Sequence, residues 1–326
     1  HKAVHAEFQP AKQHHDMYKD EELVLPETFE MTKKETLERK GKSYADNNYH
    51  NPNYNYGEGR IPDWVKEQRF SWHGVDYPYH GAQEFEDFFI KYCETIKGVD
   101  ESIGAVMAQL EQEGLLESTL VIYMGDNGFS FGEHGLIDKR HFYEESVKVP
   151  FIVHCPELFN GGENNTKMVQ NIDVAPTILE VAGLQSPTHF HGQSILPLLK
   201  GEEVTWRDKI FYEYYWEYDF PMTPTVHGVR TEKYKYIRYH GVWDTNELYD
   251  LENDPYEQNN LINDVAYSEI LRTMSDKMCT SILESINDSH SEKLINSQHK
   301  ENSTLFGDRR WVREYPVDSK CIVTAP

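Results

Sequence analysis

The longest periodic pattern of apolar residues covers positions 82–113. Apolar side chains recur there at steps of three and four residues, which is the spacing of one face of an α-helix. Gly114 follows the last periodic position, as is common just after a helix ends. The pattern therefore predicts one long amphipathic helix. Its apolar face consists of Phe85, Phe88, Phe89, Tyr92, Ile96, Val99, Ile103, Val106, Met107 and Leu110.

Two short runs of consecutive apolar residues follow this helix, at 119–124 and 149–155. Neither run alternates with polar residues, so each is consistent with a strand that is covered on both faces, as in a parallel sheet. Residues 171–184 then show a helical pattern with a proline near the first turn and a glycine after the end. These elements predict an α/β fold with a mixed, mostly parallel sheet flanked by helices.

The composition changes near residue 206. Segments beyond this point are rich in tyrosine and are separated by turn residues, which is typical of antiparallel strands. A helical pattern follows over about 264–286, whereas the last residues show no clear period. The predicted divisions are a main α/β domain at 1–205 that begins with long loops, a small antiparallel β subdomain with a C-terminal helix at 206–290, and an extended tail at 291–326.

Charge and composition limit the partners of this chain. The formal net charge is −23 over 326 residues, which argues against nucleic acid or an anionic membrane as a general partner. No apolar run approaches the roughly 18 residues that a membrane span requires. The four cysteines fit no metal-binding spacing, so they are either buried thiols or members of one or two disulfides. They are Cys93, Cys155, Cys279 and Cys321.

One segment is unusually rich in polar, charged and glycine residues. Residues 121–157 contain GDNG, GEHGLIDK and FYEES between the two apolar runs. Further along the chain, NIDVAPTILEVAGL, HGQSILPLLKG and ELYDLENDPYEQNNLI follow in that order, and HKAVHAEFQPAKQH precedes them all. Segments of this kind occur in the same order in the sulfatase family of the alkaline phosphatase superfamily. The chain resembles that family over most of its length, which implies the alkaline-phosphatase-like fold.

Asp126 and Asn127 are the candidate metal ligands. They offer two hard oxygen donors at the carboxyl end of a predicted strand, where α/β sheets place their sites. Oxygen ligation favours Ca²⁺ or Mg²⁺ over Zn²⁺, and the family resemblance implies Ca²⁺. The alternative is an Asx-turn that caps the strand end, with Gly128 at a position of positive φ.

Lys139 and His5 are the candidate catalytic residues. Lys139 lies 13 residues beyond Asp126, a spacing that resembles that of the family lysine that contacts sulfate; the alternative is a solvated surface lysine. His5 matches the family histidine that faces the leaving-group oxygen. Histidine titrates near neutral pH, so it can protonate a departing alkoxide or hydrogen-bond the sulfate.

Four further residues are candidates for substrate binding. His134 could line the pocket or could instead hydrogen-bond its own glycine-rich loop, and both alternatives stay open. Trp216, His227 and Arg230 combine aromatic and basic groups, which suit the apolar face and the charges of a sulfated sugar. The alternative for these three is a tyrosine-rich sheet that packs on the main domain.

The resemblance also identifies what the sequence lacks. Sulfatases use a cysteine in a C-x-P/A-x-R segment, converted to formylglycine, as the nucleophile, and none of the four cysteines lies in such a segment. The family's N-terminal aspartate pair and its Lys-x-His segment are also missing. The resemblance therefore implies the C-terminal portion of a sulfatase, inactive alone, whose partners are a sulfated carbohydrate and the missing N-terminal half of the catalytic domain.

The leading hypothesis is hydrolysis of sulfate esters on a sulfated polysaccharide or oligosaccharide by a secreted or periplasmic enzyme. Two alternatives stay open. The first is a phosphonate monoester or phosphodiester hydrolase of the same superfamily, and the second is a non-catalytic carbohydrate-binding homologue. A nucleophile segment upstream would favour an enzyme, and its absence would favour the binding protein.

Overall fold

The structure is a computed structural model, and its residues form two compact units. The first unit is drawn from 1–41, 66–139 and 148–163, and the second from 42–65, 140–147 and 164–326. Within these ranges, the structure describes residues 3–5, 8–31, 61–69, 71, 73–76, 84–216, 223–240 and 245–286. The tail predicted at 291–326 lies outside the described residues.

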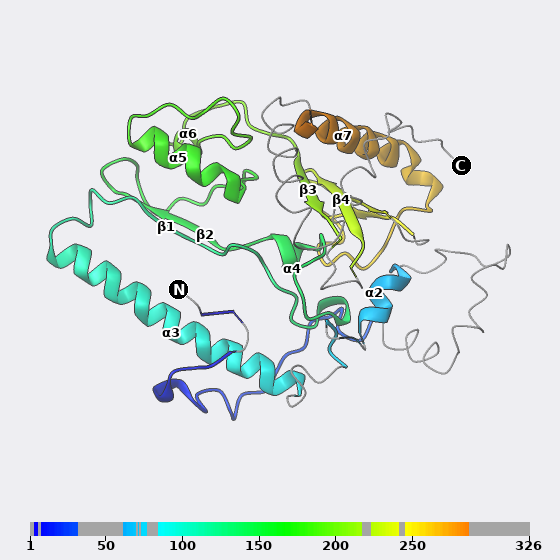
Figure 1. The fold of residues 1–326 in the computed structure, drawn as a ribbon, viewed down its shortest axis with the longest axis horizontal. Helices are drawn as coiled ribbons and strands as arrows, with labels where there is room; N and C mark the ends of the chain where they lie inside the picture. The colour runs from blue at the N-terminus through cyan, green and yellow to red at the C-terminus, as the bar shows by residue number, and fades with distance from the viewer. Residues whose placement is uncertain are drawn as a thin grey trace, which may run out of the picture. The chain divides into compact units, whose positions relative to one another are not determined.

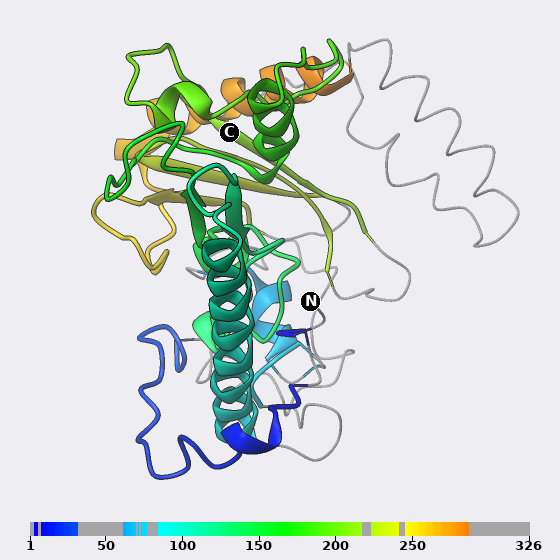
Figure 2. The same ribbon diagram turned by 90° about the vertical axis from the view of Figure 1, so that its left-hand side faces the viewer.

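A long helix runs through the first unit. This helix, α3, covers Phe85–Gln112, as predicted, and is the long cyan helix in Figure 1. The short 3-10 helix η1 (Lys12–His14) lies against it (Figure 2), where His14 Nε2 is 2.8 Å from the Glu101 carboxylate. The first turns of α3 supply aromatic rings to the core of the unit. That core consists of Phe8, Val75, Phe88, Phe131 and Ile137, with Phe29, Phe85, Phe89, Tyr92 and Phe129 packed against it.

Two short strands lie side by side in the first unit (Figure 1). β1 (Val121–Met124) and β2 (Phe151–His154) confirm the two predicted strands and the α/β class. The two strands pair antiparallel, with Tyr123 opposite Ile152, so the prediction of a parallel pairing is wrong for them. Tyr123 is 36% exposed and Ile152 is 61% exposed, so this face is not covered. A continuous apolar run suits a strand with two apolar faces, but it carries no information about strand direction.

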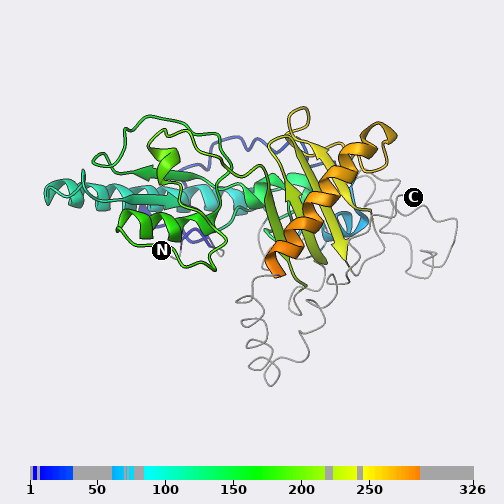
Figure 3. The ribbon, with the colours of Figure 1, turned by 90° about the horizontal axis from the view of Figure 1, so that it is seen from above.

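The second unit contains a four-stranded antiparallel sheet in the order β3-β4-β5-β6. Its core clusters around Val229, Tyr236, Leu248, Met274, Met278 and Ile282. Figure 3 shows α7 lying across one face of this sheet, which confirms the predicted β subdomain with its helix. The elements are β3 (Ile210–Tyr214), β4 (Thr225–Arg230), β5 (Tyr234–His240), β6 (Glu247–Asp250), η4 (Val265–Tyr267) and α7 (Ser268–Ile286).

Residues 164–205, which the sequence assigns to the main domain, belong to the second unit. Two contacts explain this difference. Arg207 forms a double hydrogen bond with the buried carboxylate of Asp173, and the Trp206 indole Nε1 donates to the Met168 carbonyl at 2.8 Å. The segment contains η3 (Asn171–Asp173), α5 (Val174–Val181) and α6 (Leu196–Leu199), while α2 (Asp63–Gln68) and α4 (Glu144–Val147) precede it in the chain.

No disulfide involves the cysteines that the structure describes, which are Cys93, Cys155 and Cys279. Cys321 lies outside the described residues. Among the helices of the described ranges, none combines the length and the apolar character that crossing a bilayer requires.

Candidate functional site

The segment after β1 folds back on itself and returns Lys139 to the end of the strand. The Ser130 amide donates to the Asp138 carbonyl at 2.8 Å, and the Gly132 amide donates to the Leu136 carbonyl at 2.8 Å. Gly132 has a φ of 101°, and a Cβ placed there would lie 2.5 Å from the Phe29 ring. Only glycine fits both conditions, so the first glycine of the GEHG sequence is required for this return of the chain.

Asp126, Asn127 and Lys139 meet at this strand end. The Lys139 Nζ donates to the Asn127 Oδ1 at 3.2 Å. The Asn127 Nδ2 donates to the Gly128 carbonyl at 2.7 Å, which fixes the orientation of the carboxamide. The Asp126 Oδ1 accepts the Asn127 amide at 3.0 Å, whereas an Asx-turn would use the amide two residues on. The structure therefore brings together three of the predicted site residues.

These donors fit a hard divalent cation. Asp126 and Asn127 are both exposed and adjacent in the chain, and they offer one carboxylate and one carboxamide as oxygen donors. The Lys139 ammonium at the Asn127 oxygen shows that this oxygen is oriented to meet a positive charge. Calcium takes six to eight oxygen ligands. Asp126 and Asn127 would therefore supply part of its coordination shell.

The backbone of His134 forms a hydrogen bond that helps to fix the loop. Its side chain is buried, its φ is 53°, and its backbone amide donates to the Thr28 hydroxyl at 3.1 Å. Burial raises the pKa of the neighbouring Glu133, whose carboxylate accepts the Phe131 amide. These contacts involve the His134 backbone and the neighbouring Glu133, so they leave both alternatives for the His134 side chain open. A role in substrate binding stays a prediction.

His5 lies in the short described segment at 3–5 and is exposed to solvent. No described contact connects it with Asp126, Asn127 or Lys139. Its role as the acid that protonates the leaving group stays a prediction.

Sequence reasoning did not single out a buried histidine–aspartate pair in the same unit. The His73 Nδ1 lies 3.2 Å from the Asp138 Oδ2, and the two side chains are almost completely buried. Asp138 directly precedes Lys139 in the chain. A histidine before a glycine gives no distinctive pattern, so only the fold reveals that it faces the residue next to the candidate lysine.

Arg230, a predicted substrate residue of the second unit, forms an internal ion pair. Its Nε and Nη2 donate to the two Glu144 oxygens at 2.9 and 3.1 Å. Lys235, fully buried, lies 2.7 Å from Glu144 and 2.7 Å from Glu257. Arg230 is therefore one of two cations that neutralise buried carboxylates, which favours the packing alternative over contact with a sugar.

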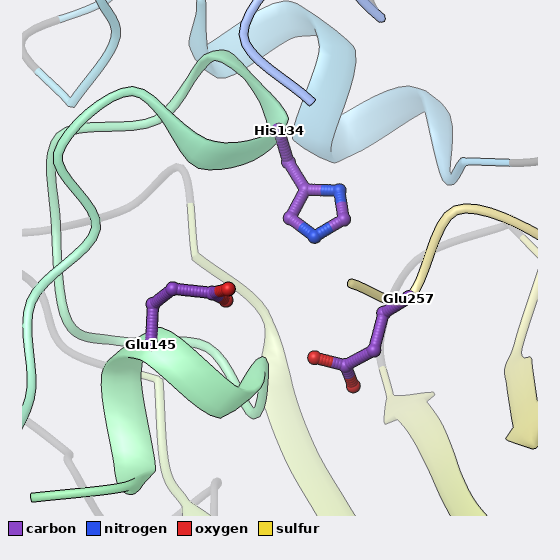
Figure 4. Close-up of side chains that lie close together, drawn as sticks. All are labelled: His134, Glu145 and Glu257. Carbon is purple, nitrogen blue, oxygen red and sulfur yellow. The ribbon is translucent and has the colours of Figure 1, made fainter. Parts of the chain in front are cut away.

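The two carboxylates of this network respond differently to their surroundings. Burial alone would raise the pKa of Glu144, but Lys235 and Arg230 overcome it and hold that pKa at about 2. For Glu257, burial outweighs Lys235 and raises the pKa to about 7. A carboxylate oxygen of Glu145 lies within 4.8 Å of one of Glu257, and Figure 4 shows the two side chains pointing toward one another. His134, drawn in the same close-up, belongs to the first unit.

His227 is enclosed within the antiparallel sheet. Its Nδ1 lies 2.9 Å from the His240 Nε2, its ring stacks on Phe211, and its Nε2 lies 3.5 Å from the Glu213 carboxylate. Burial lowers the pKa of His240 to about 3, which keeps that ring neutral. Trp216 is half-buried, and its backbone amide bonds the Thr225 hydroxyl. These placements favour packing roles, and substrate contacts by His227 and Trp216 stay predictions.

The chain belongs to the sulfatase family. A family model described as Sulfatase matches residues 8–184, and a second, described as N-sulphoglucosamine sulphohydrolase, C-terminal, matches residues 132–284. Asp126, Asn127 and Lys139 all lie within the first match. The family model thus covers the segment in which the structure brings these residues together.

Relatives and solved structures agree with this family. The chain is 33% identical over 234 residues to an N-acetylglucosamine-6-O-sulfatase from Bacteroides thetaiotaomicron, covering 70% of this chain and 40% of that protein. It is 29% identical to a multifunctional alkaline phosphatase superfamily protein from Trinickia caryophylli, covering 61% of this chain and 43% of that protein. The chain therefore spans about two-fifths of the length of these relatives.

A solved structure described as a complex with its substrate D-glucosamine-2-N,6-O-disulfate superposes with a TM-score of 0.69. It covers 90% of this chain and 66% of that chain, at 24% identity. At this identity the superposition establishes the fold, which is that of the sulfatases.

Proposed function

We propose that this chain supplies the metal-binding and sulfate-binding part of a sulfatase that hydrolyses sulfate esters of a carbohydrate. The observation that carries the proposal is the cluster of Asp126, Asn127 and Lys139 at the end of β1. A carboxylate, a carboxamide and an ammonium group at one strand end match the needs of an anionic ester that develops further charge as it reacts.

Each residue has a distinct role in this proposal. Asp126 and Asn127 hold a divalent cation, Ca²⁺ in preference to Mg²⁺, which when bound supplies a Lewis acid for the sulfate oxygens. Lys139 donates hydrogen bonds to the sulfate, because its flexible ammonium can follow the charge from ground state to transition state. His5 protonates the departing sugar oxygen. The hydrogen bond from Asn127 to the Gly128 carbonyl keeps the donor oxygen of the carboxamide outward.

The nucleophile, a formylglycine, belongs in this proposal to a segment that the present sequence does not contain. The chain alone is then inactive, and its partner is the N-terminal half of the catalytic domain. Two observations support this arrangement. The chain spans about two-fifths of its relatives, and β1 and β2 leave the apolar Tyr123 and Ile152 exposed.

The proposed substrate class is a sulfated glycosaminoglycan or related sugar. The names of the first relative, an N-acetylglucosamine-6-O-sulfatase, and of the superposed complex support a sulfated amino sugar. A sulfated polymer outside the cell is within reach of an exported enzyme, so a secreted or periplasmic location is part of this proposal. The chain is also similar to a multifunctional alkaline phosphatase superfamily protein. The test therefore has to distinguish a sulfate ester from a phosphonate or phosphodiester substrate.

The proposal is tested by metal content, measured by elemental analysis of the complete enzyme. Asp126→Ala should lose the metal and the release of sulfate, because the carboxylate contributes a full charge to the cation. Asn127→Ala should lose less metal, because a carboxamide contributes only a dipole. Asp20→Ala, at an exposed aspartate of the same unit, is the matched control and should change neither quantity.

Equal metal content in the wild type and in Asp126→Ala would show that the ligand assignment is wrong. If the enzyme turned over a phosphonate monoester but released no sulfate from a sulfated sugar, it would be a phosphonate hydrolase and not a sulfatase.

A further inference from the structure

Three chain segments of the first unit are hydrogen-bonded side by side around Asp138. The Ser130 amide donates to the Asp138 carbonyl at 2.8 Å, and on the other side the Ile137 amide donates to the His73 carbonyl at 2.7 Å. The Val75 amide donates to the Gly135 carbonyl at 3.1 Å. The residue before Lys139 is thus fixed through its own carbonyl and through its preceding neighbour.

Gly74 makes the approach of the outer segment possible. A Cβ at this position would lie 2.1 Å from the Arg69 carbonyl oxygen, so any larger residue would push the backbone away. Gly74 forms an isolated β-bridge with Leu136. The close approach places the His73 imidazole beside the Asp138 carboxylate, at 3.2 Å between Nδ1 and Oδ2.

The His73–Asp138 pair is closed off from water, while Lys139 is only half-buried. His73 is 6% exposed and Asp138 is 3% exposed. A carboxylate this deeply buried disfavours the loss of any of its partners, of which His73 is one. Removal of His73 would take away one contact that fixes the Asp138 side chain, and a shift of Asp138 would displace Lys139, the next residue in the chain.

We propose that His73 is a positioning residue, which holds Lys139 at the sulfate site through its contact with Asp138. The inference rests on the proposed function, in which Lys139 binds sulfate. The side-chain contact of His73 that carries this proposal is with Asp138, and not with Lys139 or Asn127. Its effect passes through Asp138, whose carbonyl is held by Ser130 and whose carboxylate is held by His73.

The central test is a double-mutant cycle between His73 and Lys139 in the complete enzyme. His73→Ala should lower kcat/KM for a sulfate ester by up to about 10²-fold, the order expected for displacing a catalytic group by about 1 Å. It should also weaken inhibition by inorganic sulfate. In a Lys139→Ala background, His73→Ala should cause no further loss beyond about twofold, because both changes remove the same contact.

His14→Ala is the matched control. His14 is a buried histidine of the same unit, and it pairs with a carboxylate of α3, Glu101, at 2.8 Å. Its replacement should leave the inhibition constant of inorganic sulfate unchanged. His73→Asn should rescue much of the activity, because its carboxamide nitrogen can donate from the position of Nδ1.

The outcomes separate the inference from the function on which it rests. Unchanged turnover in Lys139→Ala would overturn the proposed role of the lysine itself. A large loss in Lys139→Ala with full activity in His73→Ala would overturn only the positioning role. Multiplicative losses in the double variant would show that His73 acts independently of Lys139. Asp138→Asn, which keeps the size of the side chain, tests the same contact from its other end and should reproduce the loss.

Discussion

Replacing Lys235 with methionine should strongly destabilise the second unit. The Lys235 ammonium is fully buried and lies 2.7 Å from both Glu144 and Glu257. Methionine has a similar length and keeps the packing against the Phe142 ring, over which the ammonium lies at 5.0 Å. The substitution therefore removes a charge and leaves most of the volume in place.

The expected magnitude follows from the Glu144 pKa. The folded structure holds this pKa at about 2, compared with a reference of 4.5. Each pKa unit corresponds to about 1.4 kcal/mol, so ionised Glu144 contributes about 3 kcal/mol of stability above pH 4.5. That contribution is lost as pH falls through the folded pKa. Arg230 still pairs with Glu144 after the substitution, so Lys235→Met should remove part of this contribution and cost up to about 3 kcal/mol at pH 7.

Urea unfolding of the wild type and the variant at pH 7 and pH 3 measures this cost. The difference between the two proteins should be smaller at pH 3, where Glu144 in the unfolded state is protonated and the ion pair contributes less. Lys233→Met is the matched control, because Lys233 forms a surface pair with Glu252 and is 44% exposed. Surface pairs contribute about 0–1 kcal/mol. If Lys235→Met cost no more than Lys233→Met, the buried network would not stabilise this unit.

Two further predictions concern Glu247 and His5. The buried Glu247 carboxylate accepts hydrogen bonds from Tyr143, Tyr239 and Tyr249, and burial raises its pKa to about 7. In the unfolded state Glu247 loses its proton near pH 4.5, whereas in the folded state it keeps the proton up to about pH 7. The wild type should therefore lose up to about 3 kcal/mol of stability as the pH rises from 4.5 to 7. Glu247→Gln should flatten that dependence in urea titrations, and identical curves would refute the assignment. His5→Ala should lower kcat by roughly 10²–10⁴-fold on sugar sulfates but far less on activated aryl sulfates, whose leaving groups need little protonation. Equal losses in a comparison of the two substrates would show that the acid lies elsewhere.

The sequence predicted most accurately the elements with long or regular patterns. The helix at Phe85–Gln112 follows from ten apolar positions at helical spacing, and its first residues form the aromatic core. The antiparallel strands follow from tyrosine-rich segments separated by turn residues, and the helix at Ser268–Ile286 follows from the helical pattern after them. Asn127 and Lys139 were singled out separately, the lysine from its family-like spacing to Asp126, and the hydrogen bond that joins them became visible only in the fold.

Properties that depend on long-range contacts could not be predicted in the same way. An apolar run such as Val121–Met124 is compatible with either strand direction, so the antiparallel pairing with β2 was missed. Basic and aromatic residues such as Arg230 and His227 look alike in sequence whether they face a ligand or a buried acid. Their partners, Glu144 and His240, lie on other segments and become neighbours only through the fold. The same holds for His73 and Asp138.

The most direct test of the sulfatase account is the release of inorganic sulfate from a 6-O-sulfated N-acetylglucosamine substrate by the complete enzyme with Ca²⁺. Wild-type enzyme should release sulfate, and Lys139→Ala should release it more slowly and with a raised KM, because the lysine contacts sulfate in both the ground state and the transition state. If wild type and Lys139→Ala released sulfate at the same rate and with the same KM, the site placed at the end of β1 would be contradicted.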